Sequence, residues 1–254
     1  MKYLSQRFVI LILLYLTSSY LTGYEIGEKL TFELSYGLIK AGNSTIEINS
    51  TVYQDSIDCV EISSLSKTNK FFDKIYKVRD RINSVWDSNE NLSYRFSKKL
   101  HEGNYRQNRI HYYYPNQNLT VYMKKDKKAT KYKTKSFEIP KHTHDILSAF
   151  YWARNQELVV GDTLYANITV DGKSYVAGLF VKNLDTIPTI YGDRECVIIE
   201  PMLKGDSIFK QTGKILIWLS NDKWKIPMKI ESKIVFGSFK AILKEVSNVT
   251  YQKK

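Results

Sequence analysis

Apolar and polar residues alternate with a period of two along most of this chain. In the segment Leu30–Tyr36, every second residue is apolar or aromatic and the residues between them are polar. Side chains of a β-strand point alternately to the two faces of its sheet, so this pattern predicts a strand with one buried face. Segment 162–181 contains two such strands joined by Asp171-Gly172, a strong signal for a tight hairpin turn. Similar segments follow one another at intervals of about ten residues, which is typical of an all-β protein.

Three further features favour one strongly curved sheet. Gly37 and Gly42 interrupt the first alternating segments, which indicates a bulge or a sharp bend. Segment 215–219, ILIWL, is apolar on both faces, so we expect cover on both sides of that strand. No linker rich in proline, glycine or serine divides the chain, and no repeat of fixed period is present. We therefore expect a single β-rich domain over residues 24–254: a strongly curved, mostly antiparallel sheet or incomplete barrel with one short α-helix packed on it.

The expected helix lies in segment 142–155, HTHDILSAFYWARN, which departs from the alternation. Its apolar stripe consists of Ile146, Leu147, Phe150 and Tyr151. Asp145 is suited to cap the first turn, and Arg154 near the last turn complements the helix dipole. Asn155 is expected to end the helix in a left-handed conformation. A helix this short is marginal by itself, so we expect it to pack on the concave face of the sheet.

The N-terminal segment has the organisation of a secretory signal peptide. Lys2 and Arg7 precede an apolar run from Phe8 to Leu16, and small and polar residues follow up to Gly23. The apolar run is too short to span a bilayer comfortably. We therefore expect residues 1–23 to be removed on export. The alternative is an uncleaved N-terminal anchor.

The chain is basic, with 38 lysines and arginines against 26 acidic residues and a net charge of +12. The predicted signal peptide contains two basic residues and no acid, so +10 remains without it. A basic surface favours anionic partners, which include lipid headgroups, acidic glycans and nucleic acids. An exported protein meets the first two more often, so we expect no nucleic acid partner.

Much of this charge lies between Lys124 and Lys135, where seven lysines accompany only Asp126. The simplest interpretation is a solvated hairpin tip whose lysines protect a sheet edge. The alternative is a basic, aromatic surface that contacts anionic headgroups or glycans. The residues expected to form that surface are Tyr112, Tyr114, Lys124, Lys125, Lys127 and Lys128.

The residue types needed for catalysis are present but do not form a recognisable motif. His142 and His144 could chelate a metal ion together with Asp145, but a competent site needs a further protein ligand, and the other histidines, His101 and His111, lie in a different, strongly basic segment. Ser148 lacks the Gly-x-Ser-x-Gly pattern of a nucleophile elbow. Cys59 and Cys196 lie in β-type runs, where a thiol packs as a small apolar group; a disulfide between them is the alternative. We therefore expect no catalytic residue, metal ion or cofactor.

Four segments carry a resemblance to a known family. They read GEKLTFELSYGLIKAGNSTIEI, DILSAFYWAR, GDTLYANITVDGKSY with IPTIYGDRECVIIEP, and WLSNDKWKIPMKIESKIVFGSFKAIL. In this order they resemble the bacterial exported proteins catalogued as domain of unknown function 3108. The resemblance implies a β-rich protein of the periplasm or outer envelope of a Gram-negative bacterium, with no established activity. Its architecture is similar to the incomplete barrels of periplasmic lipid and lipoprotein carriers, which is a fold-level analogy.

These observations favour a monomeric, non-enzymatic protein that binds an apolar or amphipathic envelope ligand in a groove of the curved sheet. The residues expected at this groove are Phe150, Tyr151, Trp152 and Arg154. The first alternative is a structural or assembly factor that contacts another envelope protein and takes no small ligand. A hydrolase is the second alternative. An open groove beside the helix would favour the binding protein over the assembly factor.

Overall fold

The computed structural model of the chain describes residues 23–203, 214–233 and 238–250. The predicted signal peptide lies outside the described residues except for Gly23. The described strands form one sheet of fifteen strands in the order β8-β7-β6-β5-β4-β3-β2-β1-β15-β14-β13-β12-β11-β10-β9. β8 and β9 are the two edges of this sheet, so it does not close into a complete barrel. The predicted incomplete barrel is therefore confirmed.

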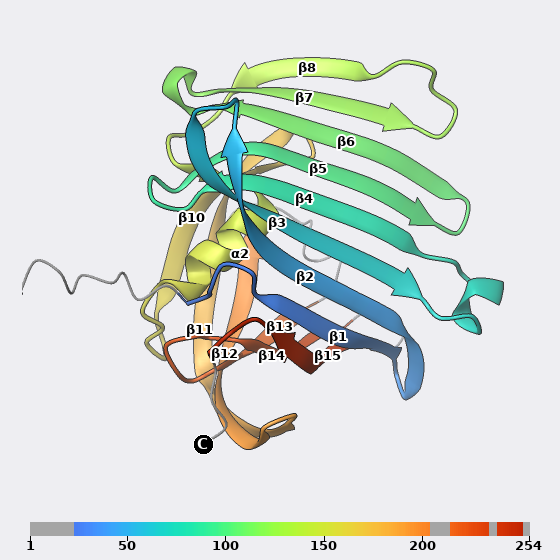
Figure 1. The fold of residues 1–254 in the computed structure, drawn as a ribbon, viewed down its shortest axis with the longest axis vertical. Helices are drawn as coiled ribbons and strands as arrows, with labels where there is room; N and C mark the ends of the chain where they lie inside the picture. Colours follow the sequence, from blue (N-terminus) through green and yellow to red (C-terminus); the bar gives the residue numbers. More distant parts are fainter. Residues whose placement is uncertain (1–22, 204–213, 234–237, 251–254) are drawn as a thin grey trace, which may run out of the picture.

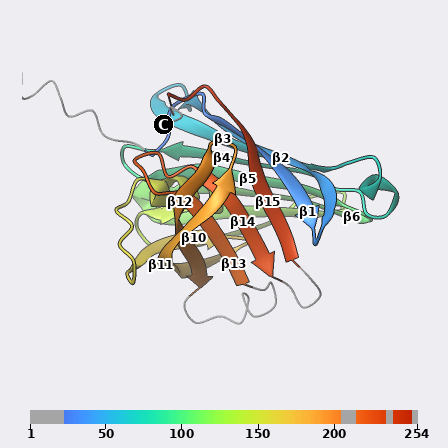
Figure 2. The same cartoon turned by 90° about the horizontal axis from the view of Figure 1, so that it is seen from below.

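The first half of the sheet consists of β1 (Lys29–Tyr36), β2 (Ile39–Tyr53), β3 (Ile57–Thr68), β4 (Arg79–Asp87), β5 (Leu92–Glu102), β6 (Tyr105–Tyr114), β7 (Leu119–Asp126) and β8 (Lys133–Glu138). The second half consists of β9 (Thr143–His144), β10 (Thr163–Val170), β11 (Lys173–Thr189), β12 (Gly192–Leu203), β13 (Lys214–Ser220), β14 (Pro227–Lys233) and β15 (Ser238–Ser247). The helical elements of the described residues are the 3-10 turns η1 (Phe72–Lys74) and η2 (Pro115–Gln117) and the α-helix α2 (Ile146–Arg154). β9 and β10 pair in parallel, and the other neighbours in the sheet are antiparallel. The two halves lie on either side of α2 (Figures 1 and 2).

The two halves also meet at the turn of the β10–β11 hairpin. Asp171 and Gly172 form this turn with φ angles of 52° and 81°, which confirms the predicted hairpin. The Asp171 carboxylate pairs with Lys98 of β5 at 2.8 Å and with Arg109 of β6. Burial would raise the pKa of Asp171, but these two cations outweigh burial and lower it. The turn is thus anchored on the first half by charge.

The helix begins and ends close to the predicted positions. Asp145 caps α2, since its side chain accepts the backbone N–H groups of Leu147 and Ser148. The predicted left-handed end at Asn155 is wrong, because this residue has φ −87° and ψ −7°. The Asn155 side chain instead accepts the backbone N–H of Gly23 at 2.7 Å. Contact with the N-terminal segment therefore replaces a left-handed cap at the end of this helix.

Buried apolar side chains form three clusters in the part of the chain that the structure describes. One fills the space between α2 and the first half and contains Trp86 and Tyr151. The other two lie on opposite faces of β12 and β13: Ile217 and Leu219 belong to one, and Trp218 to the other. Segment 215–219 is therefore covered on both sides, as its sequence predicted. Residues from β1 and β15, among them Leu30 and Leu243, belong to the cluster of Trp218 and cover that face of the segment.

One detail of the strand pattern differs from expectation, and a second agrees with it. The sequence of residues 52–65 reads as one continuous strand, but Gln54–Ser56 form a turn between β2 and β3. Gln54 and Asp55 have positive φ angles of 51° and 58° there. The expected irregularity near Gly42 is present: a Cβ atom at this position would lie 2.1 Å from the Lys67 carbonyl oxygen, so β3 can approach closely only because residue 42 is glycine.

Candidate functional site

An open groove lies between α2 and strands β10–β13. It encloses a cavity of about 350 Å³, at the lower end of the usual range for small-ligand sites. The lining residues are all apolar or glycine: Ile146, Ala149, Phe150, Trp152, Ala153, Leu164, Ala166, Ile168, Val170, Ala177, Gly178, Leu179, Ile199, Pro201, Met202, Ile215 and Ile217. Ile146 and Met202 are 49% and 39% exposed, so the groove opens to solvent.

The groove remains hollow because both of its walls contribute small side chains. Ala149 and Ala153 lie one helical turn apart on the same face of α2. Ala166 of β10 and Ala177 of β11 are directly paired across the two strands. Larger residues at these four positions would fill the space, since protein interiors normally leave few voids. The hollow is therefore a consequence of residue size on two elements that the fold places face to face.

The predicted groove residues divide between two faces of the helix. Phe150 and Trp152 line the groove, as expected. Tyr151 and Arg154 do not line it: both are fully buried on the side that faces the first half. Their spacing of three residues puts them on one helix face. The single apolar stripe predicted for this helix is thus shared between two packing surfaces.

Arg154 is held by a buried ion pair that the sequence did not reveal. Its guanidinium donates to the two carboxylate oxygens of Glu28 at 2.6 and 2.7 Å, and both side chains are 0% exposed. The Tyr151 hydroxyl donates to the same carboxylate at 3.1 Å, and Arg154 also donates to the Trp224 carbonyl oxygen. These contacts fix the C-terminal end of α2 between the N-terminal segment and the β13–β14 loop.

The other end of the helix is held by the buried carboxylate of Asp145. Beside the two backbone N–H groups, it accepts the hydroxyls of Ser84 at 2.6 Å and Ser93 at 3.0 Å. The Ser148 hydroxyl accepts the backbone N–H of Asp145 in return and completes a capping box. Burial raises the pKa of Asp145, although the hydrogen bonds from these groups oppose the shift.

Asp145 offers a test of how this wall of the groove is supported. Asp145→Asn keeps an acceptor for the helix N–H groups, whereas Asp145→Ala removes it and is expected to cost about 1–3 kcal/mol of folding stability.

Because the folded pKa of Asp145 is raised, its protonated form favours the folded state, and that stability is lost as the pH rises from about 4 through the folded pKa. Urea unfolding at several pH values should show wild type losing stability relative to Asp145→Asn over this window. Parallel pH profiles would contradict this assignment.

The residues considered for catalysis or metal binding do not converge. His142 is exposed, whereas His144 is buried between the rings of Trp86 and Trp152. His144 Nδ1 has no hydrogen-bond partner among the described residues. The Ser148 hydroxyl bonds instead to Ser93 and to the Asp145 backbone. In the described ranges, no group of three or more histidine, cysteine, aspartate or glutamate residues could hold a metal ion.

Cys59 and Cys196 are both buried and free, on β3 and β12. Burial raises the pKa of the Cys59 thiol to about 11 and that of Cys196 to about 12. Since the thiolate is the reactive form, both thiols are inert at neutral pH. This agrees with the interpretation that they pack as small apolar groups.

The structure separates the residues expected to form one anionic-surface contact. Tyr114 pairs with Leu119, the first residue of β7. Lys127 and Lys128 follow Asp126, the last residue of that strand. A strand of this length spans about 25 Å. The tyrosines therefore lie near the start of β7, whereas Lys127 and Lys128 lie in the loop beyond its end. Lys124 and Lys125 are consecutive residues of β7, so their side chains point to opposite faces of the sheet. The tip of the β7–β8 hairpin does carry the loop lysines, as the simpler interpretation expected.

His111 is a second buried residue whose position the sequence did not indicate. Its Nε2 accepts the backbone N–H of Gly172 at 3.2 Å, and its Nδ1 lies 3.1 Å from the Thr120 hydroxyl. The imidazole stacks on Tyr122 with ring centroids 4.6 Å apart. Burial lowers the pKa of His111 to about 4, so the neutral form that accepts this N–H predominates at neutral pH. His111 thus joins the β10–β11 turn to the first half beside Asp171.

Three solved structures with low sequence identity are similar to this chain to different degrees. A β-barrel-like protein of domain of unknown function DUF1849 from Brucella abortus has a TM-score of 0.56 and 11% identity, covering 87% of this chain and 97% of that chain. A protein from Bacteroides fragilis described as exported with a YmcC-like fold has a TM-score of 0.35 and 8% identity, covering 88% and 97%. One from Parabacteroides distasonis described as a lipoprotein has a TM-score of 0.32 and 8% identity, covering 90% and 98%. The first likeness shows the fold alone.

In the part of the chain that the structure describes, no helix is long and apolar enough to cross a membrane.

Two further comparisons concern the sequence itself. Among proteins with curated descriptions, none matches the chain. A family model described as protein of unknown function, DUF3108, matches residues 31–244. The four segments that suggested this family lie almost wholly within that range, and the chain therefore belongs to the DUF3108 family.

Proposed function

We propose that this protein is an exported, non-enzymatic binding protein that holds the apolar chain of an envelope amphiphile in the groove beside α2. The observation that carries the proposal is an open cavity of about 350 Å³ with a wholly apolar lining. Open apolar surface is costly in water, so such a groove gains free energy when an apolar chain displaces its solvent. A groove filled by its own side chains would instead have favoured an assembly factor.

The groove suits an amphiphile better than a polar ligand. Apolar side chains surround it, and no charged side chain of the described residues lines it; the only hydrogen-bond donor among these lining side chains is the indole N–H of Trp152. Binding sites for polar molecules contain a few polar groups that fix the orientation of the ligand. The opening of the groove at Ile146 and Met202 would leave the polar headgroup of an amphiphile in water while its apolar chain is buried. The signal-like segment 1–23 supports export, which would bring the protein to membrane amphiphiles.

Filling the groove is expected to abolish most of this binding. Ala166→Phe places a ring between β10 and the helix and displaces at least two methylene groups of a bound chain. Each buried methylene contributes about 0.8 kcal/mol, so the affinity for a fluorescent long-chain fatty acid is expected to fall about tenfold or more. Fluorescence titration of the purified protein in the absence of membranes measures this change.

The matched control is Val176→Phe on the neighbouring strand. Val176 pairs with Asn167, one position from the Ala166–Ala177 pair, and does not line the groove. This variant should bind as wild type does. Solvent extraction of the wild-type protein followed by mass spectrometry should also recover a bound amphiphile. Equal binding by the Ala166→Phe variant and wild type, together with an empty extract, would refute the proposal.

A further inference from the structure

One rim of the first half of the sheet combines exposed apolar side chains with lysines. Loops 37–38, 69–78, 103–104 and 127–132 join β1 to β2, β3 to β4, β5 to β6 and β7 to β8, and they lie side by side along the right of Figure 1. We call these four loops the basic rim. Leu38, Ile75 and Phe71 on this rim are 100%, 67% and 61% exposed. Large apolar residues at loop tips are unfavourable in water unless another surface covers them.

The charges of the basic rim are almost all positive. Its six lysines are Lys70, Lys74, Lys77, Lys127, Lys128 and Lys131, and all are exposed. None of the six forms an ion pair with a described residue. Its acidic residue, Asp73, is paired with Arg79 at 2.6 Å. The rim therefore presents a positive potential around its apolar tips.

The opposite rim of the same eight strands has the reverse character. It consists of loops 54–56, 88–91 and 115–118, with sequences QDS, SNEN and PNQN. These loops contain two acidic residues, no lysine or arginine, and no large apolar side chain. The two rims share one sheet and one solvent, so general solubility does not account for the difference. The asymmetry indicates that the basic rim faces an anionic and apolar surface.

The longest loop of the basic rim is held in a fixed shape. The Asn69 side chain accepts the Phe72 N–H at 2.9 Å, and Asp73 accepts both the Thr68 hydroxyl and the Arg79 guanidinium. These bonds order the chain around Phe71 without burying it. An exposed apolar tip on an ordered loop loses little conformational entropy when it is covered.

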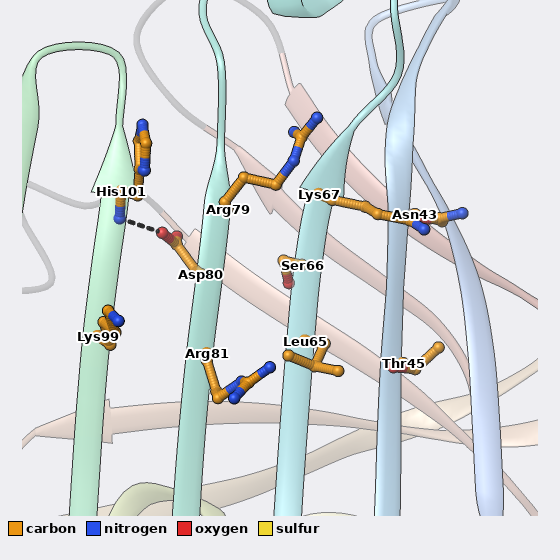
Figure 3. A pocket seen from close by; sticks show the side chains of 10 residues that line it. All are labelled: Asn43, Thr45, Leu65, Ser66, Lys67, Arg79, Asp80, Arg81, Lys99 and His101. Carbon is orange, nitrogen blue, oxygen red and sulfur yellow. Dashed lines mark hydrogen bonds between the residues drawn. The ribbon is translucent and has the colours of Figure 1, made fainter.

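A cationic groove lies directly behind this loop, on the face of β2–β5 away from the core (Figure 3). It encloses about 490 Å³, and its charged lining residues are the four cations Lys67, Arg79, Arg81 and Lys99 and one acid, Asp80, which accepts the backbone N–H of His101. Lys67 is paired across the strands with Arg79, and Arg81 with Lys99. Like charges directly opposite each other destabilise a sheet, and Lys67, Arg81 and Lys99 have no acidic partner among the described residues. An external anion would relieve this repulsion.

We propose that the basic rim docks the protein on a membrane surface rich in anionic phospholipid headgroups. Phe71 and Ile75 enter the interface, the loop lysines contact the headgroups, and the groove behind the loop takes headgroup phosphates. A membrane is the one surface that satisfies both parts of the rim, because an acidic glycan would pair with the lysines but leave the apolar tips exposed. This docking is independent of the proposed chain-binding groove beside α2, which is lined by α2 and strands β10–β13 and by no residue of the basic rim.

The test measures the fraction of the purified protein that sediments together with lipid vesicles. Wild type should bind vesicles of equal phosphatidylcholine and phosphatidylglycerol and should bind pure phosphatidylcholine at least tenfold more weakly. Near an anionic surface each lysine is worth roughly a sixfold change in binding, so Lys127→Glu with Lys128→Glu is expected to weaken binding by about thirtyfold or more. Phe71→Ser with Ile75→Ser should also weaken binding to the anionic vesicles by about tenfold.

Matched controls use residues of the same type away from the basic rim. Lys141→Glu with Lys223→Glu, and Val159→Ser with Val160→Ser, should leave vesicle binding unchanged; the last two positions are 49% and 48% exposed.

Equal binding to both vesicle types, or equal losses in control and rim variants, would overturn the proposal. So would full vesicle binding by the Phe71 and Ile75 variant together with tight, lysine-dependent binding of soluble heparin, since that result assigns the rim to a glycan. Fatty-acid titration without vesicles should be unaffected by every rim variant, which separates this proposal from the previous one.

Discussion

Replacing Arg154 with methionine is expected to lower the free energy of unfolding by about 3–5 kcal/mol. The change removes both hydrogen bonds to Glu28 and leaves its carboxylate fully buried without a cation. Loss of one partner of a buried pair is costly because the remaining charge is neither solvated nor neutralised. Urea unfolding followed by tryptophan fluorescence measures the loss. Arg154→Lys is expected to recover only part of it, since an ammonium cannot bind both carboxylate oxygens in the planar geometry of arginine.

Two controls isolate the burial of this pair. Glu28→Leu combined with Arg154→Met removes both charges together and is expected to restore most of the stability, because well-packed apolar residues often replace a buried ion pair without loss. Arg79→Met breaks the partly exposed pair with Asp73 and is expected to cost less than about 1 kcal/mol. If the double variant were as unstable as the single one, the ion pair would not be the cause of the loss.

Local features of this fold could be predicted because neighbouring residues encode them. Asp171-Gly172 favours the positive φ angles that a tight hairpin turn requires, and the structure has them. Asp145 before an apolar stripe predicted the start of α2 correctly. The turn at Gln54 and Asp55 was missed because neither residue is glycine or asparagine, although both adopt positive φ angles. Turn prediction therefore succeeded where the turn used its preferred residues and failed where it did not.

The candidate site depends on contacts that the sequence does not encode locally. Glu28 and Arg154 are 126 positions apart, and nothing near either residue indicates the other. Arg154 consequently resembled a groove residue, although its partner draws it to the opposite face of the helix. The hollow itself depends on two small residues that line the same cavity, Ala149 of α2 and Ala166 of β10. Small residues are common in helices and strands, so only the curvature of the sheet shows that these two leave a cavity between them.

The junction between the two halves is expected to weaken in mild acid. His111 and His144 are both buried, and burial lowers the pKa of each to about 4. Around His111, Lys98 and Arg109 further disfavour the charged form, while Asp171 favours it. Because the folded pKa values are depressed below 6.5, the stability from the neutral rings is present above pH 6.5 and is lost as the pH falls from 6.5 toward 4. Protonation of His111 would place a second N–H against the N–H of Gly172 and break the bond that holds the β10–β11 turn.

The expected loss between about pH 6.5 and 5 is about 1.5 kcal/mol for each of the two histidines. The two histidines should therefore together remove about 3 kcal/mol of stability from wild type across this interval, while protonation of Asp145 acts in the opposite sense. His111→Phe keeps an aromatic ring beside Tyr122 but removes the titrating group. Its stability should be lower than that of wild type at pH 7, because the Gly172 N–H loses its acceptor, and in urea unfolding it should lose about 1.5 kcal/mol less than wild type between pH 6.5 and 5. An unchanged slope in this variant would show that His111 is already solvated in the folded protein and does not hold the two halves together.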